Sequence, residues 1–351
     1  MRRRGLGLGT LAAVTACGVG DGYREWWDGD KWAVVPSGEP AVATDAGRRP
    51  TDAAVVDESD VAPDVAVEAA PPPPAIKTVF FILMSSEPWS DVAGSKSAPY
   101  INGKLLPAGA HCESYYAAPP MILQSEPNVV WLEAGQDFGF VTNGLPTVNH
   151  TASTGHLVDQ LEAAGVTWKA YVEGATAGVC PIADVPPMRT YNVPFVFFDD
   201  VVGTPPAANA KRCVEHVFPY TQLATDIAKD AVPQYAFIVP DDCDDMHDVC
   251  NGGDPVQQGD TWLSTAVPPI LASKAYTTSG AVFIAWDFAS TAYVPIGFIA
   301  LSPKAKAGFA GTAMLTASST LLSLQEIFGV GPDLGDAKNA TDLRGLFESF
   351  P

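Results

Sequence analysis

The sequence has 351 residues, of which 47% are hydrophobic and 10% aromatic, enough to bury the core of one large domain or two small ones. Charged residues make up only 17%, with 40 acidic against 20 basic, and the formal net charge is -20. This balance argues against nucleic acid as a partner, because phosphate backbones are bound by clustered Lys and Arg. Otherwise the acidity leaves the function open, since acidic surfaces commonly serve solubility.

The N-terminus has the layout of a bacterial secretory signal. Residues 1–4 are basic, and the apolar run at 5–16 is too short to span a bilayer. Small residues then precede Cys17, an arrangement that resembles a bacterial lipobox and predicts cleavage before Cys17 and a lipid on its sulfur. Val14 is a weaker lipobox residue than Leu, so plain secretion stays open. A buried N-terminal helix is disfavoured, because nothing amphipathic follows.

Residues 18–75 are predicted to form a flexible tether. Residues 18–32 are rich in Gly, Trp and Asp without a clear period, and residues 36–74 are rich in Ala, Val, Pro and Asp. Such a composition cannot bury enough apolar surface to offset the entropy of ordering. We expect the segment to hold the following domain, residues 76–351, off a membrane surface, with four prolines as its stiff end.

The pattern after residue 76 predicts an α/β fold. Runs that are apolar on both faces are typical of central strands in a parallel sheet covered by helices. Their alternation with helical patterns predicts a doubly wound, mostly parallel sheet with helices on both faces and a site at the carboxyl ends of its strands. The predicted strands are 78–84, 168–172, 234–240, 281–288 and 296–303, and the predicted helices are 126–134, 156–164, 220–231, 262–273 and 318–328.

The cysteines are interpreted as disulfide partners, because an exported chain folds in an oxidising compartment. Zinc binding is the competing interpretation, and the absence of a Cys-x-x-Cys pair disfavours it. If Cys17 carries a lipid, one cysteine must stay free, and Cys112 is the one left over. The expected pairs are Cys180 with Cys213 and Cys243 with Cys250.

Ser125 opens one of the predicted helices, in the segment Gln-Ser-Glu-Pro-Asn. The pattern places Ser125 at the N-cap, with Glu126 and Pro127 in the first turn. A helix N-terminus presents unpaired N–H groups that suit a phosphate, and a serine there could attack phosphorus. From position alone, a simple capping serine is the commoner case.

Two further segments follow predicted strands. Residues 239–248 pack five acids around His247, as a divalent cation or a proton-transfer step would need. The alternative is a solvated acidic loop tied by a disulfide. Asp287 ends a later hydrophobic run and is a candidate ligand, although alone it could equally be a helix cap.

Together these segments resemble the bacterial phosphoesterase family related to acid phosphatase and phospholipase C, in the alkaline-phosphatase-like superfamily. The resemblance covers nearly all of residues 78–351, and it implies an alkaline-phosphatase-like fold and metal-assisted hydrolysis of phosphate esters. The segments that carry it are VFFILM…WSDV (79–92), SEPNVVWLEAG (125–135), HLVDQLEAAGVTWKAY (156–171), PFVFFDD (194–200), FIVPDDCDDMHD (237–248), GDTWLSTAVPPIL (259–271), FIAWD (283–287) and SSTLLSLQEIFGV (318–330).

The resemblance also implies roles for single residues. Ser125 matches the nucleophile, and His247 would contact the phosphate or the leaving group. Asp287 matches a ligand of a divalent metal whose identity the sequence leaves open. Asn128 and Asp245 match positions that would contact the substrate.

Several positions depart from the family pattern. After the first strand the family has a metal-binding Glu-Asn pair, where this chain has Ser85 and Ser86. An acidic ligand follows the aspartate of the last strand, where this chain has Phe288. Glu87, one residue beyond Ser86, could swing into the vacant place. Other departures are Asn192 and Val193 for a His-Asn pair, Ala317 for a His and Val129 for a Tyr.

These replacements weaken metal binding, because a hard cation requires several oxygen ligands, most of them charged. Two hydroxyls in place of a carboxylate and an amide remove one negative charge, and Phe288 removes another. Without a metal, Ser125 has no Lewis acid to activate it. The loss of several kcal/mol of transition-state stabilisation predicts a rate lower by roughly a thousandfold or more.

Three hypotheses follow. The first is a phosphate-ester hydrolase outside the cytoplasm whose metal site is degraded. The second is an inactive, phosphoesterase-like surface lipoprotein that binds an unknown surface ligand and needs no metal. The third is a purely structural lipoprotein that makes contacts through the aromatic segment 23–27. In each, the chain is exported, either secreted or anchored as a periplasmic or cell-surface lipoprotein, and it touches a membrane only through its lipid.

Overall fold

The computed structural model describes residues 23–27, 32–36, 75–119 and 122–351. The chain forms two units, residues 1–69 and 70–351. In the first, β1 (Tyr23–Trp27) and β2 (Trp32–Pro36) pair as an antiparallel two-stranded sheet within the predicted tether. The predicted signal segment, Cys17 and residues 37–74 lie outside the described residues.

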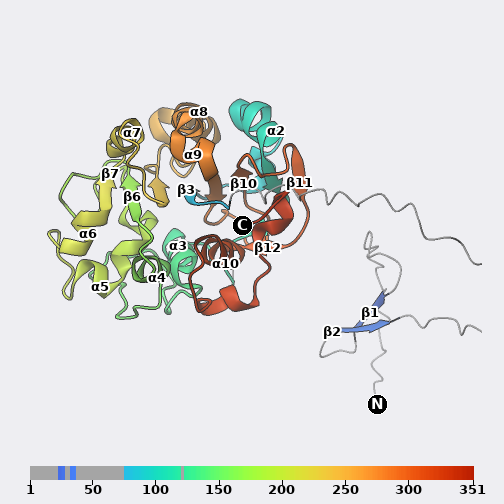
Figure 1. Cartoon of the computed structure of the whole chain (residues 1–351), viewed down its shortest axis with the longest axis horizontal. Helices are drawn as coiled ribbons and strands as arrows, with labels where there is room; N and C mark the ends of the chain where they lie inside the picture. The colour runs from blue at the N-terminus through green and yellow to red at the C-terminus, as the bar shows by residue number, and fades with distance from the viewer. Residues whose placement is uncertain (1–22, 28–31, 37–74, 120–121) are drawn as a thin grey trace, which may run out of the picture. The chain divides into compact units, whose positions relative to one another are not determined.

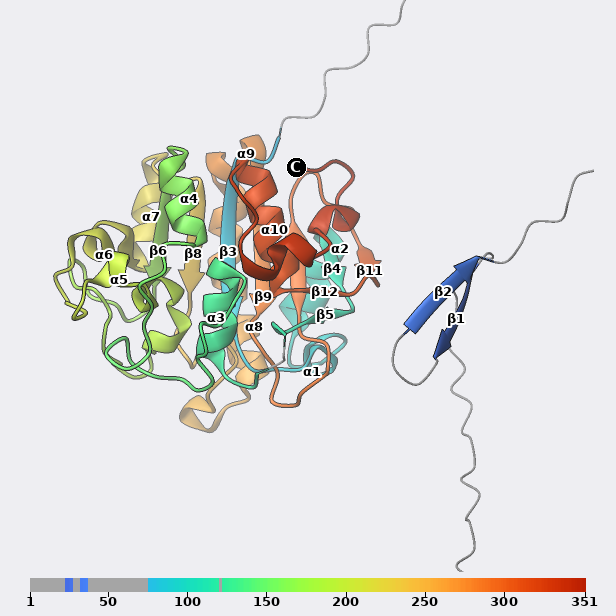
Figure 2. The same ribbon diagram turned by 90° about the horizontal axis from the view of Figure 1, so that it is seen from below.

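The second unit is built on an eight-stranded sheet. Its strands are β3 (Thr78–Met84), β4 (Ala110–Cys112), β6 (Trp168–Val172), β7 (Val217–Pro219), β8 (Tyr235–Val239), β9 (Gly280–Trp286), β10 (Phe298–Leu301) and β11 (Phe309–Gly311). Their order across the sheet is β11-β4-β10-β9-β3-β8-β6-β7 (Figures 1 and 2). Only β10 runs antiparallel to its neighbours, which confirms the predicted mostly parallel sheet.

The predicted strands form the centre of this sheet. β3 and β6 have the predicted bounds, and β8, β9 and β10 lie on the other three apolar runs. All residues of β8, β9 and β10 are buried, as expected for strands covered on both faces. The remaining strands, β4, β7 and β11, have three residues each, too few to form a recognisable apolar run.

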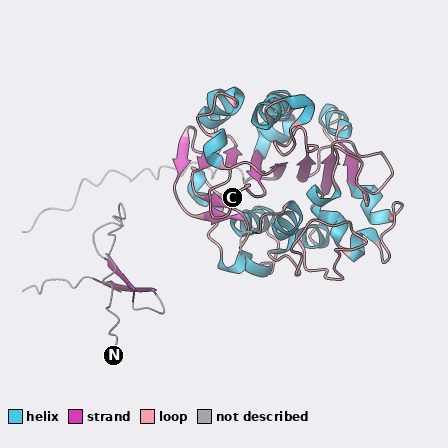
Figure 3. Ribbon diagram, turned by 180° about the vertical axis from the view of Figure 1, so that it is seen from behind, coloured by secondary structure: helices cyan, strands magenta, loops and turns pink. Residues whose placement is uncertain are grey.

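Helices cover both faces of the sheet (Figures 1 and 3). One face carries α2 (Leu106–Ala108), α7 (Thr221–Ala228), α8 (Pro255–Ala272) and α9 (Lys274–Ser279). The other carries α3 (Ser125–Ala134), α4 (Leu157–Ala163), α5 (Asp199–Val202), α6 (Lys211–His216) and α10 (Ala317–Phe328). The five predicted helices correspond to α3, α4, α7, α8 and α10.

Short elements complete the domain. α1 (Trp89–Val92) follows β3, and a π-helical turn spans Ile101–Leu105. β5 (Tyr115–Tyr116) and β12 (Leu315–Thr316) pair as a small parallel sheet. Turns of 3₁₀ helix lie at Thr190–Asn192, Pro194–Phe197, Cys250–Gly252, Gly335–Asn339 and Leu343–Leu346.

Both expected disulfides are present. Cys180 is bonded to Cys213 and Cys243 to Cys250, while Cys112 is free and buried. Disulfides persist in oxidising compartments, so the two bonds support an exported protein. Among the described residues, no helix is both long and apolar enough to cross a membrane.

One ionisable side chain of α3, that of Glu133, is buried in the core. Glu133 is completely buried, and its Oε1 accepts a hydrogen bond of 3.3 Å from the hydroxyl of Tyr235. Its Oε2 has no hydrogen-bond partner among the described residues. Burial raises the pKa of Glu133 from 4.5 to about 8, although the Tyr235 hydroxyl opposes this shift. The folded domain therefore favours the neutral carboxyl.

This raised pKa predicts a pH-dependent stability. Below the unfolded pKa of 4.5 both states are protonated, and stability falls as pH rises toward 8 because only the unfolded state has ionised. Glu133→Gln keeps a neutral acceptor for Tyr235. We expect this variant to match the native chain in Tm at pH 4.5 and to exceed it by several degrees at pH 8, measured by circular dichroism.

Glu215→Gln is the matched control, because the side chain of Glu215 is 54% exposed. It should leave the pH dependence of Tm unchanged. If the Glu133→Gln and native curves run parallel from pH 4.5 to 8, ionisation of Glu133 does not limit stability.

Candidate functional site

The pairing of β3 with β9 sets the position of the candidate site. The two strands are parallel, and Met84 lies opposite Trp286 in their register. The N–H of Asp287 donates to the carbonyl of Met84 at 3.0 Å, so the ladder continues one step past both strands. Ser85 and Asp287 therefore emerge side by side at the carboxyl edge of the sheet.

Ser125 joins them from the first turn of α3. The N-cap of this helix is Gln124 rather than Ser125, and no side chain caps it. The prediction that Ser125 is a capping serine is thus wrong by one position, and its hydroxyl is free for other contacts. Ser125 Oγ lies 3.5 Å from Ser85 Oγ, and both residues are buried. The structure thus brings Ser125, Ser85 and Asp287 together.

Asp287 is the buried charge of this centre. Its Oδ1 accepts the N–H of Phe288 at 2.8 Å and that of Ser86 at 3.4 Å, while Oδ2 has no hydrogen-bond partner among the described residues. Burial raises the pKa of Asp287 to about 6, against the opposing effects of the Ser125 hydroxyl, the Phe288 N–H and the Ser85 hydroxyl. Burial therefore disfavours the ionised form of Asp287, and the hydrogen bonds only partly offset this effect.

Asp245, in the loop after β8, lies next to this centre. Its backbone carbonyl accepts the N–H of Ser85 at 2.9 Å. One carboxyl oxygen accepts from Asn192 Nδ2 at 3.2 Å and the other from the N–H of His247 at 2.8 Å. Burial, followed by the charge of Asp242, raises the pKa of Asp245 well above its usual range. Burial therefore disfavours the ionised form of Asp245, and the hydrogen bond from the N–H of His247 opposes that effect.

A cluster missed by the sequence analysis fixes Asp242. Tyr191 donates its hydroxyl to Asp242 at 2.5 Å, Asn192 donates an amide proton at 3.1 Å, and Arg189 Nε lies 3.3 Å from the same carboxylate. Burial still raises the pKa of Asp242 overall. The available signal was the polar run from Arg189 to Asn192, directly before the Pro-Phe-Val segment.

His247 bonds within its own loop. Its Nδ1 lies 2.9 Å from Asp248 and 3.7 Å from Asp242, and the side chain is 30% exposed. The structure records no contact between His247 and Ser125 among the described residues. A role for His247 in contacting phosphate stays a prediction.

Asn128 and Glu87 also have partners of their own. The amide of Asn128 donates to the carbonyls of Ile122 and Gln124 and accepts the N–H of Ala118, so it holds the chain that leads into α3. Burial raises the pKa of Glu87, as do nearby Asp residues of the surrounding loops. No group of the Ser125 centre is among the charges that shift it, so Glu87 as a substitute ligand stays a prediction.

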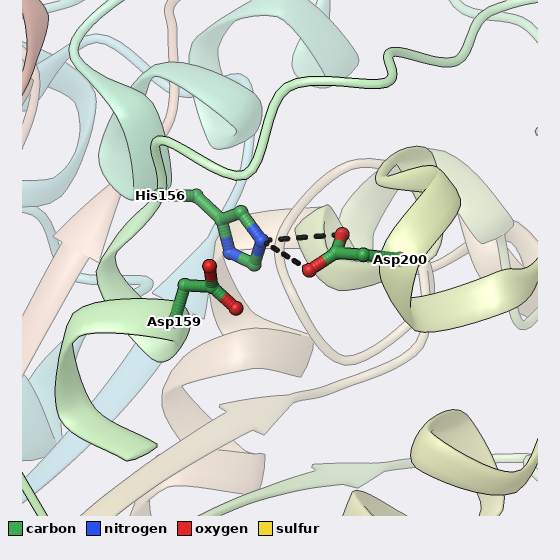
Figure 4. A group of neighbouring side chains, drawn as sticks. All are labelled: His156, Asp159 and Asp200. Atoms are coloured by element: carbon green, nitrogen blue, oxygen red, sulfur yellow. Dashed lines mark hydrogen bonds and ion pairs between the residues drawn. The ribbon is translucent and has the colours of Figure 1, made fainter. Parts of the chain in front are cut away.

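Figure 4 shows His156, Asp159 and Asp200, whose ligand atoms lie close enough together to hold a metal ion. His156 Nε2 lies 3.1 Å from Asp200. Arg212, however, forms ion pairs with both Asp159 and Asp200. Because a guanidinium already neutralises these carboxylates, the group is a partly exposed ion-pair network around the buried His156 rather than a free metal site.

Two other acidic groups lie beside the candidate site. Asp242, His247 and Asp248 form one, whose buried carboxylate is already paired with Arg189. Glu173, Asp241 and Asp244 form the second. Burial raises the pKa of Glu173 to about 7, followed by the charge of Asp244. Acidic clusters of this kind are common without an ion, and neither includes Ser125.

A model of the phosphoesterase family matches residues 95–331 of the chain. The chain belongs to this family. A phosphatidylinositol-3-phosphatase from Mycobacterium tuberculosis is 26% identical over 279 residues, covering 78% of this chain and 84% of the relative. A probable acid phosphatase from Kluyveromyces lactis is 24% identical over 221 residues, covering 61% of this chain and 48% of the relative. The chain thus spans about half the length of the yeast relative.

Solved structures show the same fold at low identity. Human ectonucleotide pyrophosphatase/phosphodiesterase 5 aligns with a TM-score of 0.52 and 12% identity, covering 78% of this chain and 100% of the other. Phosphonate monoester hydrolase of Agrobacterium radiobacter aligns with a TM-score of 0.50 and 11% identity, covering 78% of each. The domain therefore has the expected alkaline-phosphatase-like fold, within a family of phosphate-ester hydrolases.

The resemblance drawn from the sequence predicts that a divalent metal fits the residues at its ligand positions poorly. The positions that correspond to its ligands hold one carboxylate (Asp287), two hydroxyls (Ser85 and Ser86) and a phenyl ring (Phe288). The backbone N–H groups of Ser86 and Phe288 both donate hydrogen bonds to Asp287 Oδ1. A hard cation needs several charged oxygens, and among these four positions only Asp287 supplies one, while the nearby Asp245 belongs to the loop after β8.

The backbone at Ser86 has a conformation that is unfavourable for serine. Ser86 has φ of 46°, in the left-handed region that Asn tolerates more readily than Ser. Its N–H donates to Asp287, and its carbonyl accepts from Ser290 at 3.1 Å. These two bonds hold the left-handed conformation at Ser86.

We therefore expect Ser86→Asn to stabilise the domain by roughly 0.5–1 kcal/mol, because Asn relieves left-handed strain. Urea unfolding would measure the gain. Ser90→Asn is the matched control, an exposed position in α1. Equal midpoints for the Ser86→Asn and Ser90→Asn chains would show that Ser86 is not strained.

Proposed function

We propose that this chain is a catalytically inactive member of the phosphoesterase family, exported to act as a binding module outside the cytoplasm. One observation carries the proposal. Where the family has its acidic metal ligands, Asp287 stands as the only carboxylate, and it is accompanied by Ser85, Ser86 and Phe288. A site with this composition cannot balance the charge of a divalent cation.

The proposed loss of the metal would remove activity, because of the way in which phosphate esters are hydrolysed. When bound, the metal in such sites supplies a Lewis acid that lowers the barrier to nucleophilic attack. Ser125 is fully buried. Its neighbours are the uncharged hydroxyl of Ser85 and the carboxyl of Asp287, whose pKa is raised. Neither neighbour supplies the positive charge that a phosphoryl transition state requires.

Export rests on the two disulfides and on the N-terminal sequence. Disulfides form in oxidising compartments, and basic residues followed by a short apolar run are typical of secretory signals. We propose that Cys17 carries a lipid and that residues 18–75 connect this anchor to the domain. Plain secretion is the alternative if the lipobox is not processed.

The retained serine favours a second candidate, weak hydrolysis of phosphate esters with Ser125 as the nucleophile. Ser125 stands in the first turn of α3, where helix N–H groups favour an anion, and it faces Asp287. The curated relatives are named as phosphatases, so a phosphate ester is the substrate class to test. In this candidate, replacing Ser125 abolishes turnover, however slow the native turnover is.

Restoring the family's ligands separates the two candidates. The native chain, incubated with Mg²⁺, Ca²⁺, Mn²⁺ or Zn²⁺ and then desalted, should retain well under one ion per chain by mass spectrometry. The combined variant Ser85→Glu, Ser86→Asn, Phe288→Glu should retain about one, because it regains two carboxylates and an amide. Circular dichroism would confirm its fold, and Ser86→Asn with Phe288→Glu is the smaller variant if the full set fails to fold.

Activity gives a second, independent prediction. The native chain should hydrolyse p-nitrophenyl phosphate no faster than its own Ser125→Ala variant, with any of the four metals. The restored variant should be faster by roughly a thousandfold, and Ser125→Ala in that background should abolish the gain. A native chain that binds one metal ion and loses its turnover in Ser125→Ala would overturn the proposal and establish the hydrolase.

A further inference from the structure

A cavity of about 670 Å³ lies at the outer edge of the main sheet. Its walls come from β11, β12, α10 and the C-terminal 3₁₀ turn, elements that lie together in Figures 1 and 2. Three strands separate β11 from β3 in the sheet, and none of Ser125, Ser85 and Asp287 lines the cavity. Cavities of several hundred Å³ are typical of small-molecule sites, so this one is a candidate binding site of its own.

The inner wall of this cavity is apolar. Leu315 and Leu346 are buried in the wall, and Phe309 adds a ring that is 39% exposed. The free Cys112 lines the cavity as well. Its thiol donates to the carbonyl of Ala313 at 3.3 Å, and burial raises the pKa of the thiol, so Cys112 presents an uncharged, apolar contact. The wall therefore suits an aromatic or aliphatic group.

Two carboxylates share one guanidinium at the open end of the cavity. Arg344 Nε donates to Asp342 at 2.5 Å, and Arg344 Nη2 lies 3.2 and 3.4 Å from the two carboxylate oxygens of Glu326. All three residues line the cavity, and the Arg344 side chain is 61% exposed. The nearby Lys306 donates to the carbonyl of Gly345 at 2.8 Å rather than to either carboxylate. Glu326, Asp342 and Arg344 are called the charged mouth below.

The charged mouth has one negative charge in excess. Burial raises the pKa of Glu326, followed by the charge of Asp342, and Arg344 only partly offsets these two effects. One guanidinium therefore does not satisfy both carboxylates. A second cation would complete the group, whereas an anion would meet two carboxylates and a guanidinium whose N–H groups already donate to them. The charge of the mouth thus selects a cationic ligand.

We infer that this cavity binds a small organic amine, with an ammonium group on an aromatic or aliphatic body. The body occupies the inner cavity beside Cys112 and Leu315, where its removal from water stabilises the complex. The ammonium group lies at the charged mouth and donates to Glu326 and Asp342, which fixes the orientation of the ligand. The inference is independent of the proposed loss of the metal and of catalysis at Ser125.

Isothermal titration calorimetry tests the inference with the full chain carrying Cys17→Ser, so that no lipid is attached. The probes share an indole body: tryptamine carries an ammonium group, tryptophol a hydroxyl and indole-3-propionate a carboxylate. We expect tryptamine to bind roughly tenfold more tightly than tryptophol, because hydrogen bonds between charged groups replace neutral ones. Indole-3-propionate should bind more weakly than tryptophol, since the excess charge of the mouth repels it.

Two variants locate the binding site. Glu326→Gln removes the excess charge, so it should lower the affinity for tryptamine by roughly tenfold and leave that for tryptophol unchanged. Thr341→Trp places a large ring at an exposed position of the cavity lining, so it should weaken the binding of both probes. The matched controls are Glu215→Gln in α6 and Thr261→Trp in α8, both exposed and outside the cavity lining, and neither should change binding.

The inference fails if tryptamine does not bind, or if tryptophol or indole-3-propionate binds as tightly. It fails equally if Glu326→Gln keeps the native affinity for tryptamine, or if Thr341→Trp changes binding no more than Thr261→Trp, which would place the contact elsewhere on the chain. Circular dichroism would confirm the fold of each variant. If Thr341→Trp does not fold, Thr312→Trp takes its place, because Thr312 is also an exposed residue of the cavity lining.

Discussion

The parallel pairing of β3 with β9 is the constraint on which the candidate site depends. Its register sets Met84 opposite Trp286, so the next residues, Ser85 and Asp287, emerge together at the carboxyl edge. Backbone hydrogen bonds in the buried centre of a sheet fix this register. Site residues can therefore be replaced without moving the position they occupy. Ser85 and Asp287 stand where such a fold places its reacting groups, whatever their chemistry.

The same edge retains backbone strain. Four residues other than glycine have positive φ in the loops that follow β3, β8 and β9, and strain of this kind collects at functional sites. Met246, buried with φ of 81°, is the most demanding, because a long side chain seldom adopts that conformation. Strain at this edge is consistent with a functional site there. The four residues are Ser86, Met246, Asn251 and Tyr293.

The central elements were predictable because their signal is local and strong. β3 and β6 are continuous apolar runs, and an apolar run long enough to cross a buried sheet has few alternative structures. The start of α8 was placed too late, since Asp254 caps the helix and accepts the N–H groups of Val256 and Gln257. A capping aspartate inside an acidic, Gly-rich stretch resembles an ordinary loop residue.

The candidate site was harder to predict, because its contacts cross long stretches of sequence. Ser125 and Ser85 meet across 40 residues, and only the family pattern connected them in advance. The bonds from Tyr191 and Asn192 to Asp242 were not predicted, because Tyr191 lies in no motif, Asn192 was noted only as a departure from the family pattern, and their partner is about 50 positions away. Polar contacts of this kind follow from the tertiary arrangement and leave no periodic trace in the sequence.

The replaced ligands form a physically consistent set. If only one metal ligand had changed, the remaining carboxylates would stay buried without a cation, and unpaired buried charges are strongly destabilising. With Ser85, Ser86 and Phe288 in place, Asp287 is the one carboxyl left of that set, and two backbone N–H groups donate to it. Its pKa of about 6 keeps the penalty for ionisation at neutral pH small. Under the proposed loss of the metal, Asp287 is thus the one carboxyl of these four positions that needs donors, while the neighbouring Asp245 is held separately by Asn192 and by the N–H of His247.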